Sequence, residues 1–115
     1  MATLSIVIPA YNEEKRIGRM LNNYSLYFEN LRKNKKLDYE FIVVINNTSD
    51  RTEEIVRAAQ KNNPRIRYLN FKQGGKGFAV IEGFKEALKK DADFIGFVDA
   101  DMSTSPQEYA KLFFS

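Results

Sequence analysis

Two aspartates stand one residue apart in the stretch DFIGFVDADMSTSP, residues 93–106, directly after an almost wholly apolar run. Residues two apart in an extended segment point to the same side, so Asp99 and Asp101 present their carboxylates together. Such carboxylates repel each other unless a cation lies between them, and Mg²⁺ takes one or two carboxylates, several waters and phosphate oxygens. The pair therefore favours a site for a hard cation and a phosphate-bearing ligand. The alternative is a solvated turn in which one aspartate caps the next helix.

The chain of 115 residues contains no histidine and no cysteine. This composition excludes the commonest general base, the commonest zinc ligand and any disulfide framework. A metal bound here must have oxygen ligands, as Mg²⁺ and Mn²⁺ do. The first residues, MATLSIVIPAYNEE, lack the basic region of a signal peptide, and no apolar run approaches the roughly 18–20 residues of a membrane span. We therefore expect a cytoplasmic protein.

Two further stretches carry groups suited to a nucleotide. In QGGKGFAV, residues 73–80, three glycines and Lys76 precede a helix, so backbone N–H groups and a cation can approach a phosphate. The stretch fits neither a Walker loop nor GxGxxG, and an ordinary strand-to-helix turn is the alternative. In IPAYNEE, residues 8–14, Tyr11 can stack on a base and Glu13 can accept from ribose hydroxyls, although acids also favour the first turn of a helix.

Strand-like and helix-like segments alternate four times along the chain. Short apolar or alternating runs predict strands over residues 4–11, 39–46, 65–71 and 93–99. Apolar spacing of three and four residues predicts helices over residues 13–31, 49–63, 78–90 and 105–115, with Ser49 or Asp50 and Ser105 as caps and Pro106 at the first position of the last helix. This order predicts a single α/β domain over residues 1–115, with a parallel sheet and helices on both faces.

Ligands of such sheets bind beyond the carboxyl ends of the strands. The segments that follow the four predicted strands are Pro9–Glu13, Asn46–Thr48, Gln73–Gly77 and Asp99–Asp101. All four should open on one edge of the sheet, and we expect the site there.

Four stretches, in this order and at this spacing, carry a family resemblance: SIVIPAYNEEKRI, EFIVVINNTSDRTEEIV, GGKGFAVIEGFKEAL and FIGFVDADMSTSPQEY. Together they resemble the donor-binding half of inverting family 2 glycosyltransferases with the GT-A fold, which include dolichyl-phosphate mannose and glucose synthases. The resemblance covers essentially the whole chain. It implies a Rossmann-like, three-layer α/β/α fold with a mostly parallel sheet that is incomplete at the C-terminus.

The resemblance also implies a nucleotide-sugar site. The residues that match the family's motifs are Pro9, Ala10, Tyr11 and Glu13 around the base and ribose, Lys76 and Gly77 near the nucleotide, and Asp99, Ala100 and Asp101 in the DxD motif. In the family, the second acid of that motif binds a divalent metal on the diphosphate and the first lies near the ribose and sugar. Asp101 and Asp99 are therefore the candidate ligands for Mg²⁺ or Mn²⁺.

The chain departs from the family after its second predicted strand. Where the family has the pattern VDDGSxDxT, this chain reads VINNTSDRT, so Ile45 and Asn46 replace two acids while Asp50 and Thr52 are kept. The Asn46 carbonyl can accept from a base N–H as an acid does, but without charge. We therefore include Asn46 among the nucleotide-sugar residues and expect an altered nucleotide preference.

The function implied by the resemblance is that of a hexosyltransferase. It would transfer sugar from a UDP- or GDP-linked hexose, with inversion, to a polyprenyl phosphate or a glycan. The acceptor site and the general base are expected beyond residue 115, so we assign no catalytic residue. One alternative is a non-catalytic module that binds a nucleotide or nucleotide sugar. A phosphotransferase of the haloacid dehalogenase type, suggested by DADMS, is disfavoured because only fourteen residues follow Asp101, and a plain structural domain leaves the polar strand ends unexplained.

The basic run LRKNKK, residues 31–36, has two interpretations: a solvated helix end, or a patch for an anionic membrane. No aromatic residue interleaves with it, so we expect no nucleic-acid partner. Membrane association is expected only through a part beyond residue 115, which would put the full-length protein at a cytoplasmic membrane face. A homo-oligomer remains open. The apolar ending KLFFS is expected to be covered by further chain or by a partner subunit.

Overall fold

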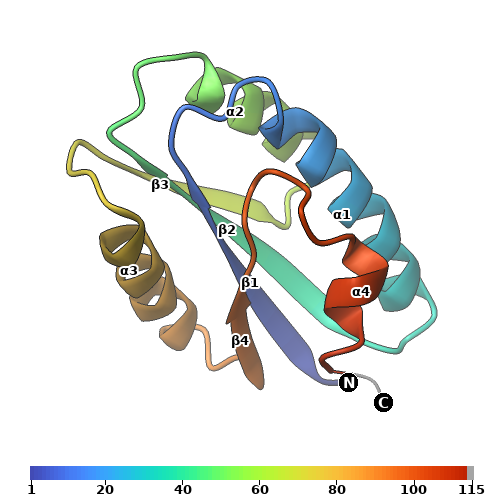
Figure 1. The fold of residues 1–115 in the computed structure, drawn as a ribbon. Helices are drawn as coiled ribbons and strands as arrows, with labels where there is room; N and C mark the ends of the chain where they lie inside the picture. Colours follow the sequence, from blue (N-terminus) through green and yellow to red (C-terminus); the bar gives the residue numbers. More distant parts are fainter. Residues whose placement is uncertain (114–115) are drawn as a thin grey trace.

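A computed structural model describes residues 1–113, in which strands and helices alternate four times as the sequence predicts (Figure 1). The elements are β1 (Thr3–Ala10), α1 (Ile17–Lys33), β2 (Asp38–Asn46), α2 (Thr52–Asn62), β3 (Ile66–Phe71), α3 (Lys76–Leu88), β4 (Phe94–Phe97) and α4 (Pro106–Ala110). The α/β fold is confirmed.

The four strands form one sheet in the order β3-β2-β1-β4, and every pairing among the described residues is parallel. Ile8 pairs with Val43 of β2, and Val44 pairs with Leu69 of β3. The sheet is thus wholly parallel over residues 1–113, where the expectation was a mostly parallel one. Helices cover both faces, which agrees with a GT-A, Rossmann-like domain.

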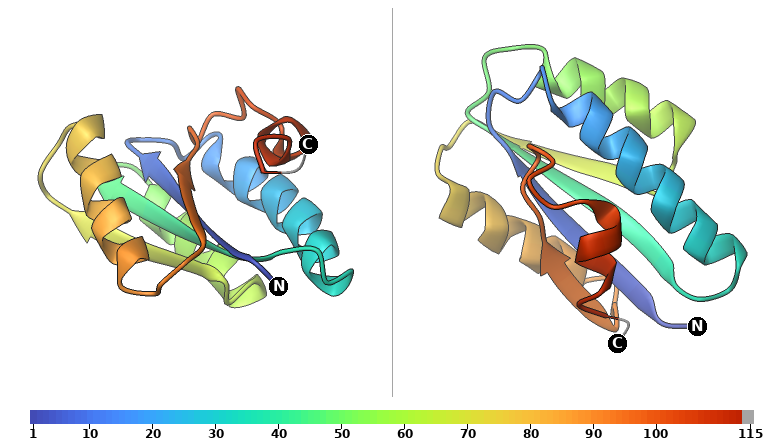
Figure 2. Two further views of the ribbon diagram at one scale, coloured as in Figure 1. Left: turned by 90° about the horizontal axis from the view of Figure 1, so that it is seen from below. Right: turned by 45° about the vertical axis from the view of Figure 1, so that its right-hand side comes forward.

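The two faces of the sheet are covered unequally (Figure 2). Helices α1, α2 and α4 pack on one face, where the larger apolar core includes Ile6, Ile8 and Phe41 together with Tyr24 and Phe28 of α1. Helix α3 alone packs on the other face against a smaller core. Because successive residues of a strand point to opposite faces, each apolar run supplies both cores.

Several element boundaries differ from the expectation. Helix α1 begins at Ile17 because the Glu13 carbonyl accepts from the backbone N–H groups of Arg16 and Ile17, which makes a separate turn before the helix. Helix α3 begins at Lys76, two residues earlier than expected, so this lysine opens the helix. Strand β4 ends at Phe97, although the backbone N–H of Val98 still donates to the Val7 carbonyl at 3.0 Å.

The predicted caps have mixed outcomes. The Ser105 hydroxyl accepts from the Glu108 N–H at 3.1 Å, and Pro106 opens α4, as expected. Neither Ser49 nor Asp50 is the N-cap of α2, which is Arg51. Helix α4 ends at Ala110, earlier than expected, and the end of the predicted helix, residues 114–115, lies outside the described residues.

The far edge of β4 pairs with no other strand among residues 1–113. The Phe94 ring lies 5.6 Å from the ring of Phe113, which is also 5.6 Å from the ring of Tyr109. Phe113, which the sequence left without cover, is therefore packed within this chain. Leu112 is 74% exposed, as expected of a side chain without cover here.

Gly83 allows α3 to lie close to the sheet. A Cβ atom at this position would lie 2.3 Å from Cγ1 of Val7 and 3.1 Å from Cγ2 of Val44, so α3 would have to move away from the sheet. At Gly77, on the first turn of the same helix, a Cβ atom meets nothing within 4 Å.

Gly83→Ala should therefore destabilise the chain by about 1–3 kcal/mol through overpacking, although alanine is the better helix former. Urea unfolding followed by circular dichroism measures the change. Gly77→Ala is the matched control and should leave the stability unchanged or raise it. Equal stabilities of the two variants would show that α3 does not need the close approach.

Candidate functional site

A cavity of about 470 Å³ lies at the carboxyl edge of the sheet, where four loops meet. Its lining comes from the carboxyl ends of strands and from the segments that follow them, and consists of Pro9, Tyr11, Glu13, Asn46, Asn47, Gly74, Gly75, Lys76, Asp99, Ala100 and Asp101. Residues more than 80 positions apart in the sequence thus face one space. This follows from the parallel sheet, because all the strands end at the same edge.

Eight of the ten residues named from the sequence line this cavity. Of the other two, Ala10 is buried in the larger core and Gly77 lies on the first turn of α3, beside the lining. Three further lining residues, Asn47, Gly74 and Gly75, lie in the segments 46–48 and 73–77 that the sequence placed at this edge, but they were not singled out as site residues. The glycine-rich stretch that contains two of them was the available signal.

Asp99 and Asp101 enter the cavity from the loop after β4, and each already has an internal partner. Asp99 Oδ1 lies 2.6 Å from the ammonium nitrogen of Lys76. Asp101 Oδ1 accepts from the backbone N–H of Ser103 at 3.0 Å, and this bond, helped by the positive charge of Arg16, lowers the pKa of Asp101 below its ordinary value. Asp99 is therefore paired with a cation, whereas Asp101 is bonded to a neutral N–H that favours its charged form.

The β4–α4 loop is fixed to the body of the domain through Tyr24 of α1. The phenol of Tyr24 donates to the Thr104 carbonyl at 2.6 Å, and burial raises the pKa of that phenol. Within the loop, Met102 has a φ of 63°, a left-handed conformation that side chains rarely adopt. The chain thus turns sharply directly after Asp101.

Asn46 at the end of β2 anchors the glycine loop. Its side-chain amide donates to the Gly75 carbonyl at 3.2 Å, and Gly75 has a φ of 103° that favours glycine. Because this carbonyl can only accept, the nitrogen of the amide must face it. An aspartate at position 46 has no hydrogen to donate, so this anchor depends on the departure from the family's pattern.

The two residues that stand where the family has acids occupy different environments. Ile45 is fully buried in the larger core, whereas Asn46 lines the cavity. The alternation of a strand explains the difference, because neighbouring residues point to opposite faces. Only the second replacement changes the chemistry of the cavity wall.

The kept residues Asp50 and Thr52 hold the loop after β1 in place. The Thr52 hydroxyl accepts from the Glu13 N–H at 2.9 Å, and Asp50 Oδ2 accepts from the Glu14 N–H at 3.2 Å. Burial disfavours the charged form of Asp50, but hydrogen bonds from the Thr52 hydroxyl and N–H outweigh it and lower the pKa of Asp50. The carboxylate of Glu13 is in turn paired with Arg16.

Comparison with known proteins matches residues 5–114 to glycosyl transferase family 2. The chain belongs to this family.

Three of the relatives that match this chain are much longer than it. It is 40% identical over 110 residues to a dolichyl-phosphate beta-glucosyltransferase of Trichomonas vaginalis, across 94% of this chain and 32% of the relative. It is 33% identical over 113 residues to a dolichyl-phosphate beta-glucosyltransferase of Dictyostelium discoideum, across 95% of this chain and 34% of the relative. Against a dolichol-phosphate mannosyltransferase of Pyrococcus furiosus the identity is 30% over 109 residues, across 95% of this chain and 28% of the relative. The chain thus spans about a third of each.

The donor atoms of this family 2 chain fit a hard divalent cation. Two carboxylates, Asp99 and Asp101, line one cavity and are partly exposed, and Mg²⁺ commonly takes that number of protein ligands and completes its shell with water and phosphate. Within residues 1–113 no group of three or more acidic side chains lies close enough to hold a metal. A cation here would therefore depend on ligand oxygens as well as on protein.

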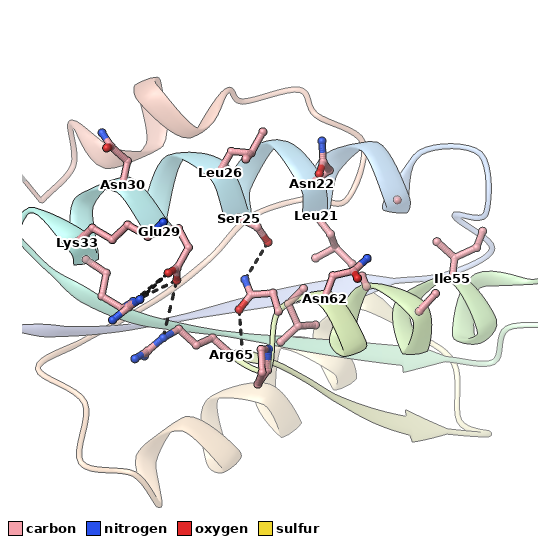
Figure 3. Close-up of a pocket in the computed structure, with 17 residues that line it drawn as sticks. Leu21, Asn22, Ser25, Leu26, Glu29, Asn30, Lys33, Ile55, Asn62 and Arg65 are labelled. Carbon is pink, nitrogen blue, oxygen red and sulfur yellow. Dashed lines mark hydrogen bonds and ion pairs between the residues drawn. The ribbon is translucent and has the colours of Figure 1, made fainter.

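A larger hollow of about 1030 Å³ lies between α1 and α2, and none of the ten nucleotide-sugar residues named from the sequence lines it (Figure 3). Its polar groups largely bind one another: Arg32 donates to both oxygens of Glu29, and the Asn63 amide donates to the Ser25 hydroxyl at 3.0 Å. The Tyr39 phenol donates to Glu29 at 2.7 Å. Unlike this hollow, the smaller cavity lies at the strand ends, where ligands of parallel α/β sheets bind. No helix within residues 1–113 is both long and apolar enough to cross a membrane.

Asn46→Asp should destabilise the chain by about 1–3 kcal/mol, because it leaves the Gly75 carbonyl without its donor and places a charge beside it. Thermal and urea unfolding measure the loss. Asn47→Asp, at the exposed neighbouring position, is the control. The anchor would be refuted if the two variants were equally stable.

The hydrogen bonds from Arg32, which outweigh partial burial, hold the pKa of Glu29 at about 2, below the ordinary 4.5. A lowered pKa in the folded state stabilises it above the unfolded value, and this contribution is lost as the pH falls through the folded value. Glu29→Gln should therefore be less stable than the wild type at pH 7. The difference should shrink between pH 4.5 and about 2, which urea unfolding at several pH values measures. A difference that stays constant with pH would contradict this assignment.

Proposed function

We propose that this chain forms the donor-binding part of a glycosyltransferase and holds a nucleoside diphosphate sugar at the carboxyl edge of its sheet. One observation carries the proposal: a family 2 chain brings an aromatic ring, a glycine loop with a lysine, and two aspartates to one cavity. Each of these groups suits a different part of such a donor. A simple structural domain has no need of them together.

The nucleoside end of the donor is proposed to lie against the loops after β1 and β2. Tyr11 is 55% exposed and free to stack on a base, and Glu13 and Pro9 line the same wall. Asn46 directs its amide nitrogen at Gly75, so its oxygen is the atom left to accept from a base N–H. In this arrangement the uncharged amide oxygen of Asn46 accepts the hydrogen bond from the base.

The diphosphate is proposed to lie between the start of α3 and the DxD motif. No side chain caps α3, so the N–H groups of its first turn are available to an anion, and Gly77 offers no side chain in the way. Lys76 supplies a positive charge at the same point. Asp101 and Asp99 would hold Mg²⁺ or Mn²⁺, which when bound neutralises the charge that develops on the leaving diphosphate.

In the proposed reaction, the bond between the anomeric carbon and the diphosphate oxygen breaks as an acceptor oxygen bonds to that carbon from the opposite face. The names of the relatives point to a dolichyl phosphate acceptor, and another relative, 31% identical over 111 residues, is an undecaprenyl-phosphate 4-deoxy-4-formamido-L-arabinose transferase of Edwardsiella ictaluri. We therefore propose a polyprenyl phosphate as acceptor. The described residues supply the donor side of this reaction.

The test is calorimetric titration of the chain with UDP, GDP and their hexose conjugates, first with Mn²⁺ and then with a chelator. One nucleotide should bind in a metal-dependent manner. Asp101→Asn should weaken that binding about tenfold or more with the fold intact, because it removes a charge from the cation site.

Asp91→Asn, which changes an exposed aspartate at the end of the domain far from the cavity, is the matched control and should bind as the wild type does. Unchanged affinity of Asp101→Asn in Mn²⁺ would refute the metal assignment. Absence of binding to every nucleotide would refute the donor site in this chain. Binding without transfer to any polyprenyl phosphate by the full-length protein would instead favour a non-catalytic nucleotide-sugar module.

A further inference from the structure

Lys76 and Asp99 come from different elements that line the cavity, and their charged groups meet there. Lys76 is the first residue of α3, and Asp99 lies two residues beyond β4. The lysine nitrogen is 2.6 Å from Asp99 Oδ1, with 58% of the lysine side chain and 44% of the aspartate side chain exposed. The same nitrogen lies 5.8 Å from the centre of the Phe97 ring.

Lys76 and Asp99 are therefore ion-pair partners of each other within the cavity. A carboxylate paired with an ammonium group is a weaker partner for a dication, because the lysine already neutralises it. The lysine, in turn, is held on the β4 side of the cavity. Under the proposed function, both groups would instead be needed by the donor complex.

We propose that Lys76 and Asp99 are an exchange pair that couples the binding of a diphosphate to the binding of a divalent cation. A diphosphate that enters the cavity draws Lys76 onto its oxygens, and Asp99 becomes available to the cation. The inference rests on the proposed donor site, and it deepens that function by assigning a coupling role to two of its residues.

The structure favours exchange at this pair over a permanent bridge. Ion pairs with both partners exposed contribute little to stability, so this one opens at small cost. The backbone beside Lys76 is anchored, since Asn46 donates to the Gly75 carbonyl at 3.2 Å. The lysine can therefore change partners by rotating its side chain while α3 and the glycine loop stay in place.

Asp101 behaves differently from Asp99. It has no ion pair among the described residues and accepts instead from the neutral N–H of Ser103. A cation alone therefore meets one available carboxylate, and a cation with a diphosphate meets two. Coupling of this kind is reciprocal, so the cation must strengthen diphosphate binding by the same factor.

The experiment uses four forms of the chain: wild type, Lys76→Met, Asp99→Asn and the double variant. Mn²⁺ affinity is measured by calorimetry or by the electron paramagnetic resonance of free Mn²⁺, first alone and then with saturating pyrophosphate. Without pyrophosphate, Asp99→Asn should change the Mn²⁺ affinity of the wild type by less than about twofold. In the Lys76→Met background it should weaken Mn²⁺ binding about fivefold or more. With pyrophosphate, it should weaken Mn²⁺ binding in the wild type as well.

Lys72→Met is the matched control, because Lys72 precedes the same glycine loop and has no ion pair among the described residues. This variant removes one positive charge without breaking an ion pair. In its background, Asp99→Asn should change the Mn²⁺ affinity by the same factor as in the wild type. Circular dichroism and urea unfolding of every variant show whether the fold is intact.

The exchange would be overturned if Asp99→Asn weakened Mn²⁺ binding by the same factor in all backgrounds, with or without pyrophosphate. It would also be overturned if the wild type bound no Mn²⁺ even with pyrophosphate. Pyrophosphate and Mn²⁺ contain neither base nor sugar. Failure of the exchange is therefore distinguishable from failure of the donor site, which the nucleotide titrations test separately.

Discussion

Parallel pairing of β1 with β2 on one side and with β4 on the other is the constraint on which the site depends. The register sets Ala10 opposite Ile45 and Val7 opposite Phe97, so β1 and β2 end at nearly the same level, while β4 ends about three residues before β1 and its following loop continues toward the same edge. Every polar group that lines the cavity lies at or beyond such an end. The strands themselves can then remain apolar and fill two cores, because the chemistry is delivered by loops that the sheet brings together.

Successive residues of β2 face opposite sides of the sheet, so its two departures from the family pattern affect different parts of the structure. Replacement of the first acid by Ile45 falls on the buried face, where a charge would be costly and an apolar side chain adds to the core. Replacement of the second acid by Asn46 falls on the cavity face, where the amide gains a bond to Gly75 that a carboxylate cannot make. The two adjacent substitutions therefore have opposite physical consequences, one for packing and one for the shape of the glycine loop.

The sequence predicted the parts of this structure that depend on local pattern. Strand positions, the alternation with helices, the common edge and eight of the ten named residues followed from periodicity, topology and family resemblance. Contacts between distant loops could not be predicted in this way. The anchor from Asn46 to Gly75 joins positions 29 residues apart, and the pairing of Lys76 with Asp99 depends on where α3 begins. Helix α3 begins two residues earlier than the sequence predicted, because no capping side chain marks its start.

The cavity is built from paired charges. Glu13 is paired with Arg16, which lies outside the lining, and Lys76 is paired with Asp99, so three of the four charged residues that line the cavity have an ion-pair partner. Asp101 is the acid that faces the cavity without an ion pair among the described residues. A cation can approach Asp101 without breaking a pair, but an anion that takes Lys76, or a cation that also takes Asp99, breaks their pair and leaves one partner uncompensated. A dianionic diphosphate that arrives with a dication satisfies both partners of an opened pair, which makes a charge-balanced ligand the one best matched to this cavity.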